Sequence, residues 1–138
     1  MKPETLFGPV SALALWTGVV VLITGIRRIQ AVRRGRMPVD ALRPGETSEV
    51  PYDVAVANRN LMNLLEMPLL FYVVCTCLYV TTHVDHTVLQ LAWAYVALRL
   101  VHSLIHLSWN RVTHRLVPFA LNNFVLLALW ILFMTRAL

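Results

Sequence analysis

Residues 58–80 read NRNLMNLLEMPLLFYVVCTCLYV, a polar entrance to a long apolar run. Arg59, Asn63 and Glu66 are spaced four and then three residues apart, which places them on one face of an α-helix. Beyond Pro68 the run carries no charged residue. A polar face at the entrance of an apolar helix must meet other polar groups, because charges inside a membrane pair or line a wet cavity.

The composition of the whole chain is that of a membrane protein. Hydrophobic residues make up 58% of the 138 residues and charged residues only 14%, whereas a soluble domain carries about 25% charged residues. No charged residue occurs from Leu6 to Ile26 or from Val117 to Thr135, and about 20 apolar residues span a bilayer as a helix. The sequence therefore predicts one all-α integral membrane domain, residues 1–138, with the lipid bilayer as its surroundings.

Four membrane helices are predicted, at about residues 6–34, 53–80, 87–109 and 117–136. Prolines and glycine mark the connection between the first two helices. Pro118 is placed in the first turn of the fourth helix, where proline is common. The predicted architecture is a four-helix bundle.

Arginine is concentrated in the first and third connections, which together hold eight arginines, against only Lys2 and Arg136 on the opposite side. Positive charge marks the cytoplasmic side of membrane proteins. We therefore expect a multi-pass protein of the cell inner membrane or endoplasmic reticulum with both termini non-cytoplasmic. This topology also accounts for the net charge of +5 without nucleic acid as a partner. The eight arginines are Arg27, Arg28, Arg33, Arg34, Arg36, Arg43, Arg111 and Arg115.

The third helix repeats the polar pattern of the second. Arg99, His102 and His106 are three and then four residues apart, again on one face. A short linker makes the two helices antiparallel neighbours, so residues at equal depth have position numbers that add to the same total. The level pairs predicted in this way are Glu66 with Arg99, Asn63 with His102, and Arg59 with His106.

Two readings of this polar layer differ in function. In the first, Glu66 and Arg99 form an ion pair while the other groups line a polar pocket that opens toward the cytoplasmic side. In the second, the layer is structural and fixes helix register, although one ion pair would suffice for that. His102 and His106 could also ligate a metal, but no third ligand lies nearby in the sequence, so no metal site is predicted.

These residues resemble the MAPEG family, the membrane-associated proteins of eicosanoid and glutathione metabolism. The second helix of that family carries Arg, Asn and Glu at the spacing of Arg59, Asn63 and Glu66, followed by a proline, here Pro68. Further positions resemble the prostaglandin E synthase-like members, and the resemblance covers nearly the whole chain. These positions are Arg28 in ITGIRR, Asp40 in DALR, and Arg99, His102, Ser103, Arg111 and Arg115.

The resemblance implies a homotrimer of four-helix subunits that binds glutathione between subunits, while a lipophilic substrate arrives from the bilayer. It assigns to Arg115 the stabilisation of the glutathione thiolate, which agrees with the effect of a nearby guanidinium on a thiol. The residues it places around glutathione are Arg28, Arg59, Asn63, Glu66, Arg99, His102 and His106.

The chain also departs from the prostaglandin-synthesising relative. His106 and Phe119 stand at tyrosine positions and Asn123 at a glutamine position, so prostaglandin and leukotriene chemistry is not inherited. The expected function is that of a glutathione-dependent transferase, peroxidase or isomerase acting on a lipophilic electrophile. The alternative is a non-catalytic membrane protein that uses the polar layer for assembly or for binding an anionic ligand.

Overall fold

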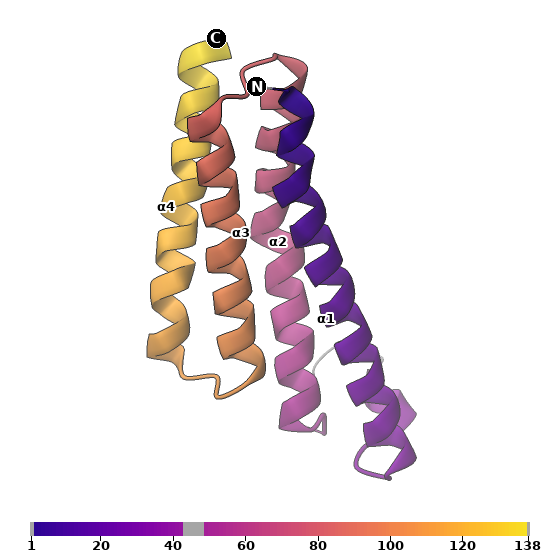
Figure 1. Cartoon of the computed structure of the whole chain (residues 1–138). Coiled ribbons are helices and arrows are strands. Elements are labelled where there is room, and N and C mark those ends of the chain that lie inside the picture. The colour runs from indigo at the N-terminus through magenta and orange to yellow at the C-terminus, as the bar shows by residue number, and fades with distance from the viewer. Residues whose placement is uncertain (1, 43–48, 138) are drawn as a thin grey trace.

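The structure is a computed structural model that describes residues 2–42 and 49–137, and it contains four long helices (Figure 1). These are α1 (Phe7–Arg33), α2 (Tyr52–Val80), α3 (His86–Leu107) and α4 (Val112–Ala137). Two short 3₁₀-helices, η1 (Pro3–Leu6) and η2 (Val39–Leu42), precede α1 and α2. The described residues form no strand, which confirms the all-α prediction.

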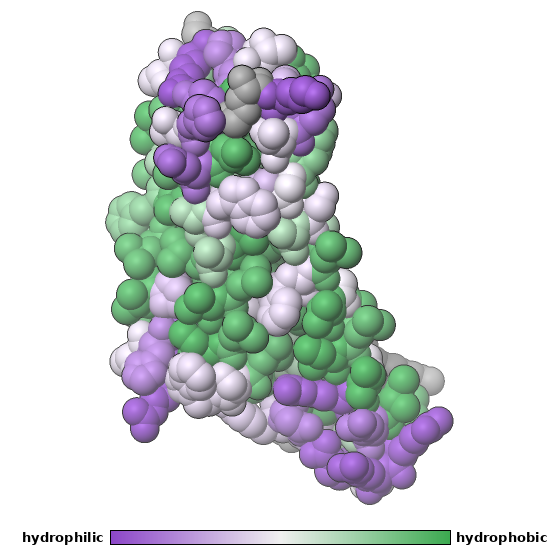
Figure 2. All heavy atoms as spheres, viewed as in Figure 1, coloured by the Kyte–Doolittle hydropathy of each residue, from purple (hydrophilic) through white to green (hydrophobic). Residues whose placement is uncertain are grey.

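All four helices are long and apolar enough to cross a membrane. Large apolar side chains stay exposed along them, such as Leu15 at 72%, Leu22 at 65% and Phe124 at 68%. Figure 2 shows apolar residues in a broad middle belt, with hydrophilic residues gathered at the two ends. Because burying apolar surface gains about 25 cal/mol per Å², such a belt is stable in lipid and unfavourable in water. The chain is therefore a multi-pass membrane protein.

The core contains buried apolar residues from all four helices. Phe71 of α2 and Tyr95 of α3 stack with their ring centroids 4.3 Å apart and their planes 8° apart. The buried residues of the same cluster include Leu13 and Val20 of α1, Leu64, Val74 and Leu78 of α2, Ala92 of α3, and Leu126 and Leu129 of α4.

A buried hydrogen-bonded group joins three helices within this apolar surrounding. Trp16 Nε1 of α1 and Asn60 Nδ2 of α2 both donate to Ser103 Oγ of α3, at 2.9 and 2.8 Å. Asn60 and Ser103 are fully buried. Because an unpartnered donor is costly in an apolar layer, this group fixes the depth at which the three helices meet.

The fourth helix begins at Val112, five residues before the predicted start, and contains Pro118 in its second turn. Proline removes the N–H that would bond the carbonyl of the fourth residue before it, but it does not prevent a helical turn upstream. Here the turn is also held from outside, since His102 Nδ1 of α3 lies 2.9 Å from the carbonyl oxygen of Arg115. Arg115 therefore lies in the first turn of α4 rather than before the helix.

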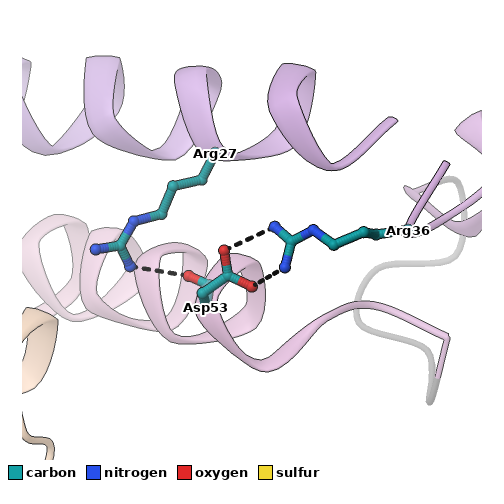
Figure 3. A network of polar contacts seen from close by, with 3 residues as sticks. All are labelled: Arg27, Arg36 and Asp53. Carbon is teal, nitrogen blue, oxygen red and sulfur yellow. Dashed lines mark hydrogen bonds and ion pairs between the residues drawn. The ribbon is translucent and has the colours of Figure 1, made fainter. Parts of the chain in front are cut away.

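The chain between α1 and α2 is tied to the first turn of α2 by Asp53 (Figure 3). Arg36 Nη1 and Nη2 donate to the two carboxylate oxygens of Asp53 at 3.0 and 2.9 Å, and Arg27 Nη1 donates to the Asp53 carbonyl at 2.9 Å. The hydrogen bond with Asp53 raises the pKa of Arg36 above its ordinary value. Of the eight arginines, Arg43 lies outside the described residues.

Candidate functional site

Arg115 lines two cavities, whose residues come from the first half of α2, the end of α3 and the start of α4. The start of α2, the end of α3 and the start of α4 lie at the end of the bundle opposite the two termini (Figure 1). The first measures about 210 Å³ and the second about 260 Å³. Arg115 therefore forms their shared wall. The first is lined by Asn63, His102, Val112, Arg115, Leu116 and Phe119. The second is lined by Tyr52, Ala55, Val56, Arg59, His106, Asn110 and Arg115.

Asn110 positions the Arg115 side chain. Arg115 Nη1 donates to Asn110 Oδ1 at 3.0 Å, and Asn110 Nδ2 donates to the Tyr52 hydroxyl at 2.9 Å. Asn110 has a φ of 45°, a left-handed conformation that asparagine tolerates, and its N–H donates to the Ile105 carbonyl at 2.9 Å. The residue that turns the chain between α3 and α4 thus also holds the guanidinium.

Sequence reasoning missed Asn110 and Tyr52 as site residues. The available signal was an asparagine just past the end of an apolar helix, where a left-handed residue often stands. Nothing in the sequence indicated the long-range contact from Tyr52, 58 positions away.

His102 and His106 both lie almost entirely inside the protein, with exposed fractions of 5% and 0%. Their ring centroids are 6.0 Å apart. His102 Nδ1 contacts the Arg115 carbonyl, whereas His102 Nε2 and both ring nitrogens of His106 are buried without a hydrogen-bond partner. Since buried polar groups normally have partners, these nitrogens indicate a place where a ligand or water binds.

The expected ion pair between Glu66 and Arg99 is wrong for the single chain. Arg99 is fully buried, and its Nη2 donates to the carbonyl oxygen of Asn63, while the Glu66 side chain lies on the exposed surface of α2. The face of α2 that meets α3 is the neighbouring one, with Asn60 and Leu64 buried. Each residue along a helix is rotated by about 100° from the one before. Glu66 is two residues after the buried Leu64, so its side chain points away from α3.

The other two level pairs do share a cavity. Asn63 and His102 both line the first cavity, and Arg59 and His106 both line the second. These two predicted level pairs are therefore confirmed as neighbours, while their roles as ligand-binding residues stay a prediction.

Arg28 and Glu66 are the candidate residues that a single chain does not bring near Arg115. Arg28 Nη2 donates to Asn58 Oδ1, and its side chain lines a separate cavity beside α1 and Leu42. Arg99 lines neither Arg115 cavity, but its guanidinium lies 6.0 Å from the ring centroid of Phe119, which lines the first.

A third cavity, of about 390 Å³, continues from the first along α4. It shares Leu116 and Phe119 with the first cavity. Its remaining lining is almost wholly apolar, and Phe124 is 68% exposed on the membrane-facing surface. The residues that complete it are Ala120, Asn123, Phe124 and Leu127. A polar cavity thus adjoins an apolar one that opens toward the lipid.

The charges of the Arg115 cavities favour an anionic ligand. Arg59 and Arg115 contribute permanent positive charges, and no acidic side chain lines either cavity among the described residues. Within residues 2–42 and 49–137, no group of three or more His, Cys, Asp or Glu side chains could hold a metal ion. The arrangement can therefore bind a carboxylate or thiolate next to an apolar molecule.

Comparison with known proteins identifies one family. The family model of the MAPEG family matches residues 6–135, nearly the whole chain. Neither the curated proteins nor the solved structures gave a match to the chain.

Proposed function

Because the chain belongs to the MAPEG family, which includes glutathione transferases, peroxidases and isomerases, we propose that it is a glutathione-dependent membrane enzyme acting on a lipophilic electrophile. The observation that carries the proposal is the place of Arg115. Its side chain lies between two cationic cavities and next to an apolar cavity that opens toward the lipid. A hydrophilic thiol and a lipid-soluble substrate can meet at that point.

The residues of the chain divide the binding of glutathione between them. Glutathione has two carboxylates, one ammonium and a thiol, and it supplies the nucleophilic sulfur. Arg115 stabilises the negative charge on that sulfur, because a nearby guanidinium lowers the pKa of a thiol. Arg59 and Arg28 suit the carboxylates, since a guanidinium binds them bidentately. Asn63, Arg99 and His106 hold the remaining polar atoms of the peptide, and His102 lies beside the sulfur.

A second copy of the chain completes the site in this proposal. The Arg115 cavities have no acidic group for the ammonium of glutathione among the described residues. Glu66 is exposed on α2 and Arg28 lies away from Arg115 on α1. A homotrimer in which α1 and α2 of neighbouring subunits meet would bring both toward the cavities. Its mass in mild detergent and in lipid nanodiscs tests this, and a monomer in both contradicts it.

The same proposal includes the orientation in the membrane. The Arg115 cavities lie at the arginine-rich end of the bundle, which the positive-inside rule assigns to the cytoplasm, where glutathione is available. Both termini are then non-cytoplasmic. Accessibility of a cysteine introduced at either terminus to an impermeant reagent checks this.

The experiment that tests the function combines binding and turnover. Glutathione should raise the melting temperature of the purified protein, with a stabilisation of about 2.7 kcal/mol at 100 times Kd, and the protein should conjugate it to a lipophilic aryl halide. Binding without turnover on conjugation, peroxide and isomerisation substrates would favour the non-catalytic alternative, a membrane protein that binds an anionic ligand. Absence of any stabilisation would contradict the proposal.

A further inference from the structure

The tautomer of His102 is fixed by the contact it makes with α4. His102 Nδ1 lies 2.9 Å from the carbonyl oxygen of Arg115. A carbonyl oxygen only accepts hydrogen bonds, so Nδ1 must carry the proton. In the neutral ring Nε2 then has a free lone pair.

That lone pair belongs to a side chain that lines the first cavity. His102 is only 5% exposed, and Nε2 is buried with no hydrogen-bond partner. The same cavity is lined by Asn63 and Arg115. A buried acceptor without a donor costs about 1–3 kcal/mol, and a ligand that brings an S–H or O–H donor removes that cost.

Resting on the proposed glutathione function, we propose that His102 Nε2 is the base that accepts the proton of the glutathione thiol. The S–H bond breaks, its electron pair remains on sulfur beside the Arg115 guanidinium, and an N–H bond forms at Nε2. The imidazolium keeps its Nδ1–H bond to the Arg115 carbonyl. Proton and electron pair are both accounted for, and no further reactant is needed.

Other residues of the first cavity cannot take this role. An arginine guanidinium is always protonated and has no acceptor atom, so Arg115 can stabilise the sulfur but cannot receive its proton. Val112, Leu116 and Phe119 carry no polar side-chain atom, and the Asn63 amide is not a base at neutral pH. Among the described residues lining this cavity, His102 alone has a nitrogen lone pair.

The charged groups around His102 determine the condition under which its ring can carry a second proton. Arg115 of α4 contacts the ring through its carbonyl oxygen, and His106 of α3 lies 6.0 Å from it between ring centroids. Arg99 of α3 lies against Phe119, which also contacts the ring. On α2, Arg59 lies beside His106 in the second cavity. The three arginines oppose an imidazolium on its own, and the negative charge that forms on sulfur in the same step offsets them. Proton transfer is therefore coupled to glutathione binding.

The test is the ultraviolet absorbance of the glutathione thiolate on the reconstituted protein as a function of pH. In His102→Asn, the amide nitrogen replaces Nδ1 and keeps a donor for the Arg115 carbonyl, while the base is lost. The pH midpoint of thiolate formation should rise toward that of a free thiol, about 8.5. Turnover at neutral pH should fall by about a hundredfold, the lower range for general base catalysis.

Two controls separate this role from folding and from binding. S-methylglutathione has no thiol proton, so its Kd should change less than about threefold in His102→Asn, within the usual spread of measured contributions. His86→Asn, at the far end of α3, should leave the pH midpoint unchanged. His102→Gln serves as the second base-free variant if His102→Asn does not fold.

The outcomes distinguish the two proposals. Wild-type protein that forms the thiolate, with both base-free variants keeping its pH midpoint, would overturn the role of His102 and leave the proposed function standing. Wild-type protein that binds no glutathione would overturn the proposed function and this inference together. A raised midpoint with unchanged binding of S-methylglutathione supports both.

Discussion

At the end of the bundle that carries both termini, the charged side chains of Asp85 and Arg136 are paired, whereas at the opposite end several ring nitrogens are buried without partners. Asp85 accepts a hydrogen bond from the Val88 N–H at 2.8 Å and forms a 2.9 Å ion pair with Arg136. At the opposite end, His102 Nε2 and both ring nitrogens of His106 have no hydrogen-bond partner. Among the described residues, the end with the termini holds one buried ring nitrogen without a partner, His83 Nδ1, so the unused hydrogen-bonding capacity is concentrated at the opposite end.

This difference separates structural from binding residues. A paired group has already recovered the cost of its desolvation, so it contributes to folding. A buried group without a partner lowers stability unless a ligand binds, and proteins accept that cost at functional sites. Mutations at the two ends should therefore affect stability and ligand binding separately.

The largest effect is expected from Arg115→Ala. Turnover should fall by about a hundredfold or more, the scale on which kcat falls when a group that stabilises developing negative charge is removed. The thiolate absorbance should also disappear, while Kd for glutathione changes little because the carboxylate contacts remain. Stopped-flow absorbance measures thiolate formation, and thermal shift measures Kd for glutathione. Arg59→Ala should instead raise Kd for glutathione more than it affects formation of the thiolate.

Arg111→Ala is the matched control for this prediction. Arg111 lies four residues before Arg115, is exposed, and lines neither cavity. Its loss should leave thiolate formation intact. Equal losses of turnover in Arg111→Ala and Arg115→Ala would mean that only the local positive charge matters, and the specific role of Arg115 would be wrong.

The second prediction concerns the paired group in the membrane core. Ser103→Ala removes the acceptor of both Trp16 Nε1 and Asn60 Nδ2, and each buried donor left without a partner costs about 1–3 kcal/mol. The melting temperature should fall, while Kd for glutathione measured well below that temperature should not. Ser108→Ala, just past the end of α3 and exposed, should have little effect on either. A changed Kd with unchanged stability would contradict a structural role.

How far the sequence predicts this molecule depends on which physical constraint acts. Bilayer thickness dictates the length of an apolar run, so the four helices and their order could be predicted from the sequence. The start of α4 could not, because Pro118 suits a first turn but is also tolerated in the second turn found here.

The sequence predicts the depth of the candidate site residues in the bundle, but not how each helix is rotated about its own axis. Equal depth in antiparallel helices follows from chain geometry, and it correctly joined Asn63 with His102 and Arg59 with His106 in shared cavities. Which face of α2 meets α3 depends on packing, and the buried side-chain contact with α3 is made by Asn60 rather than by Glu66. The support of Arg115 by Asn110 depends on a left-handed turn, which no helical periodicity reveals.

A smaller effect is expected at the paired end from Asp85. Hydrogen bonding to the Val88 N–H, followed by the charge of Arg136, lowers the pKa of Asp85 below its ordinary value. Its contribution is therefore present above the unfolded-state pKa of about 3.9 and is lost as pH falls through the lower folded-state value. Asp85→Ala should cost about 1 kcal/mol at neutral pH, as for loss of an N-cap, and should not change Kd for glutathione.

Asp85→Asn separates the cap from the ion pair. Asparagine caps helices as well as aspartate does, but it has no charge to titrate. Its melting temperature at neutral pH should lie close to that of the wild type, since an exposed ion pair contributes little, and the additional loss below pH about 4 should vanish. An unchanged acid profile in this variant would show that another carboxylate is responsible.

The smallest effects are expected from one turn at each end of the bundle. Thr82, just after α2, has a φ of 59°, and Gly35, just after α1, has a φ of 65°. Because a left-handed backbone costs about 1–2 kcal/mol for a residue with a Cβ, Thr82→Gly should raise stability. The gain is reduced to about 0.5–1 kcal/mol since glycine also loosens the unfolded chain. Gly35→Ala should lower stability by about 1 kcal/mol, and only through the backbone, because a Cβ there meets no atom within 4 Å. Melting temperatures of the two variants should therefore move in opposite directions, while thiolate formation stays unchanged in both. A shift of the same sign in both would show that the two turns do not share this conformation in the membrane.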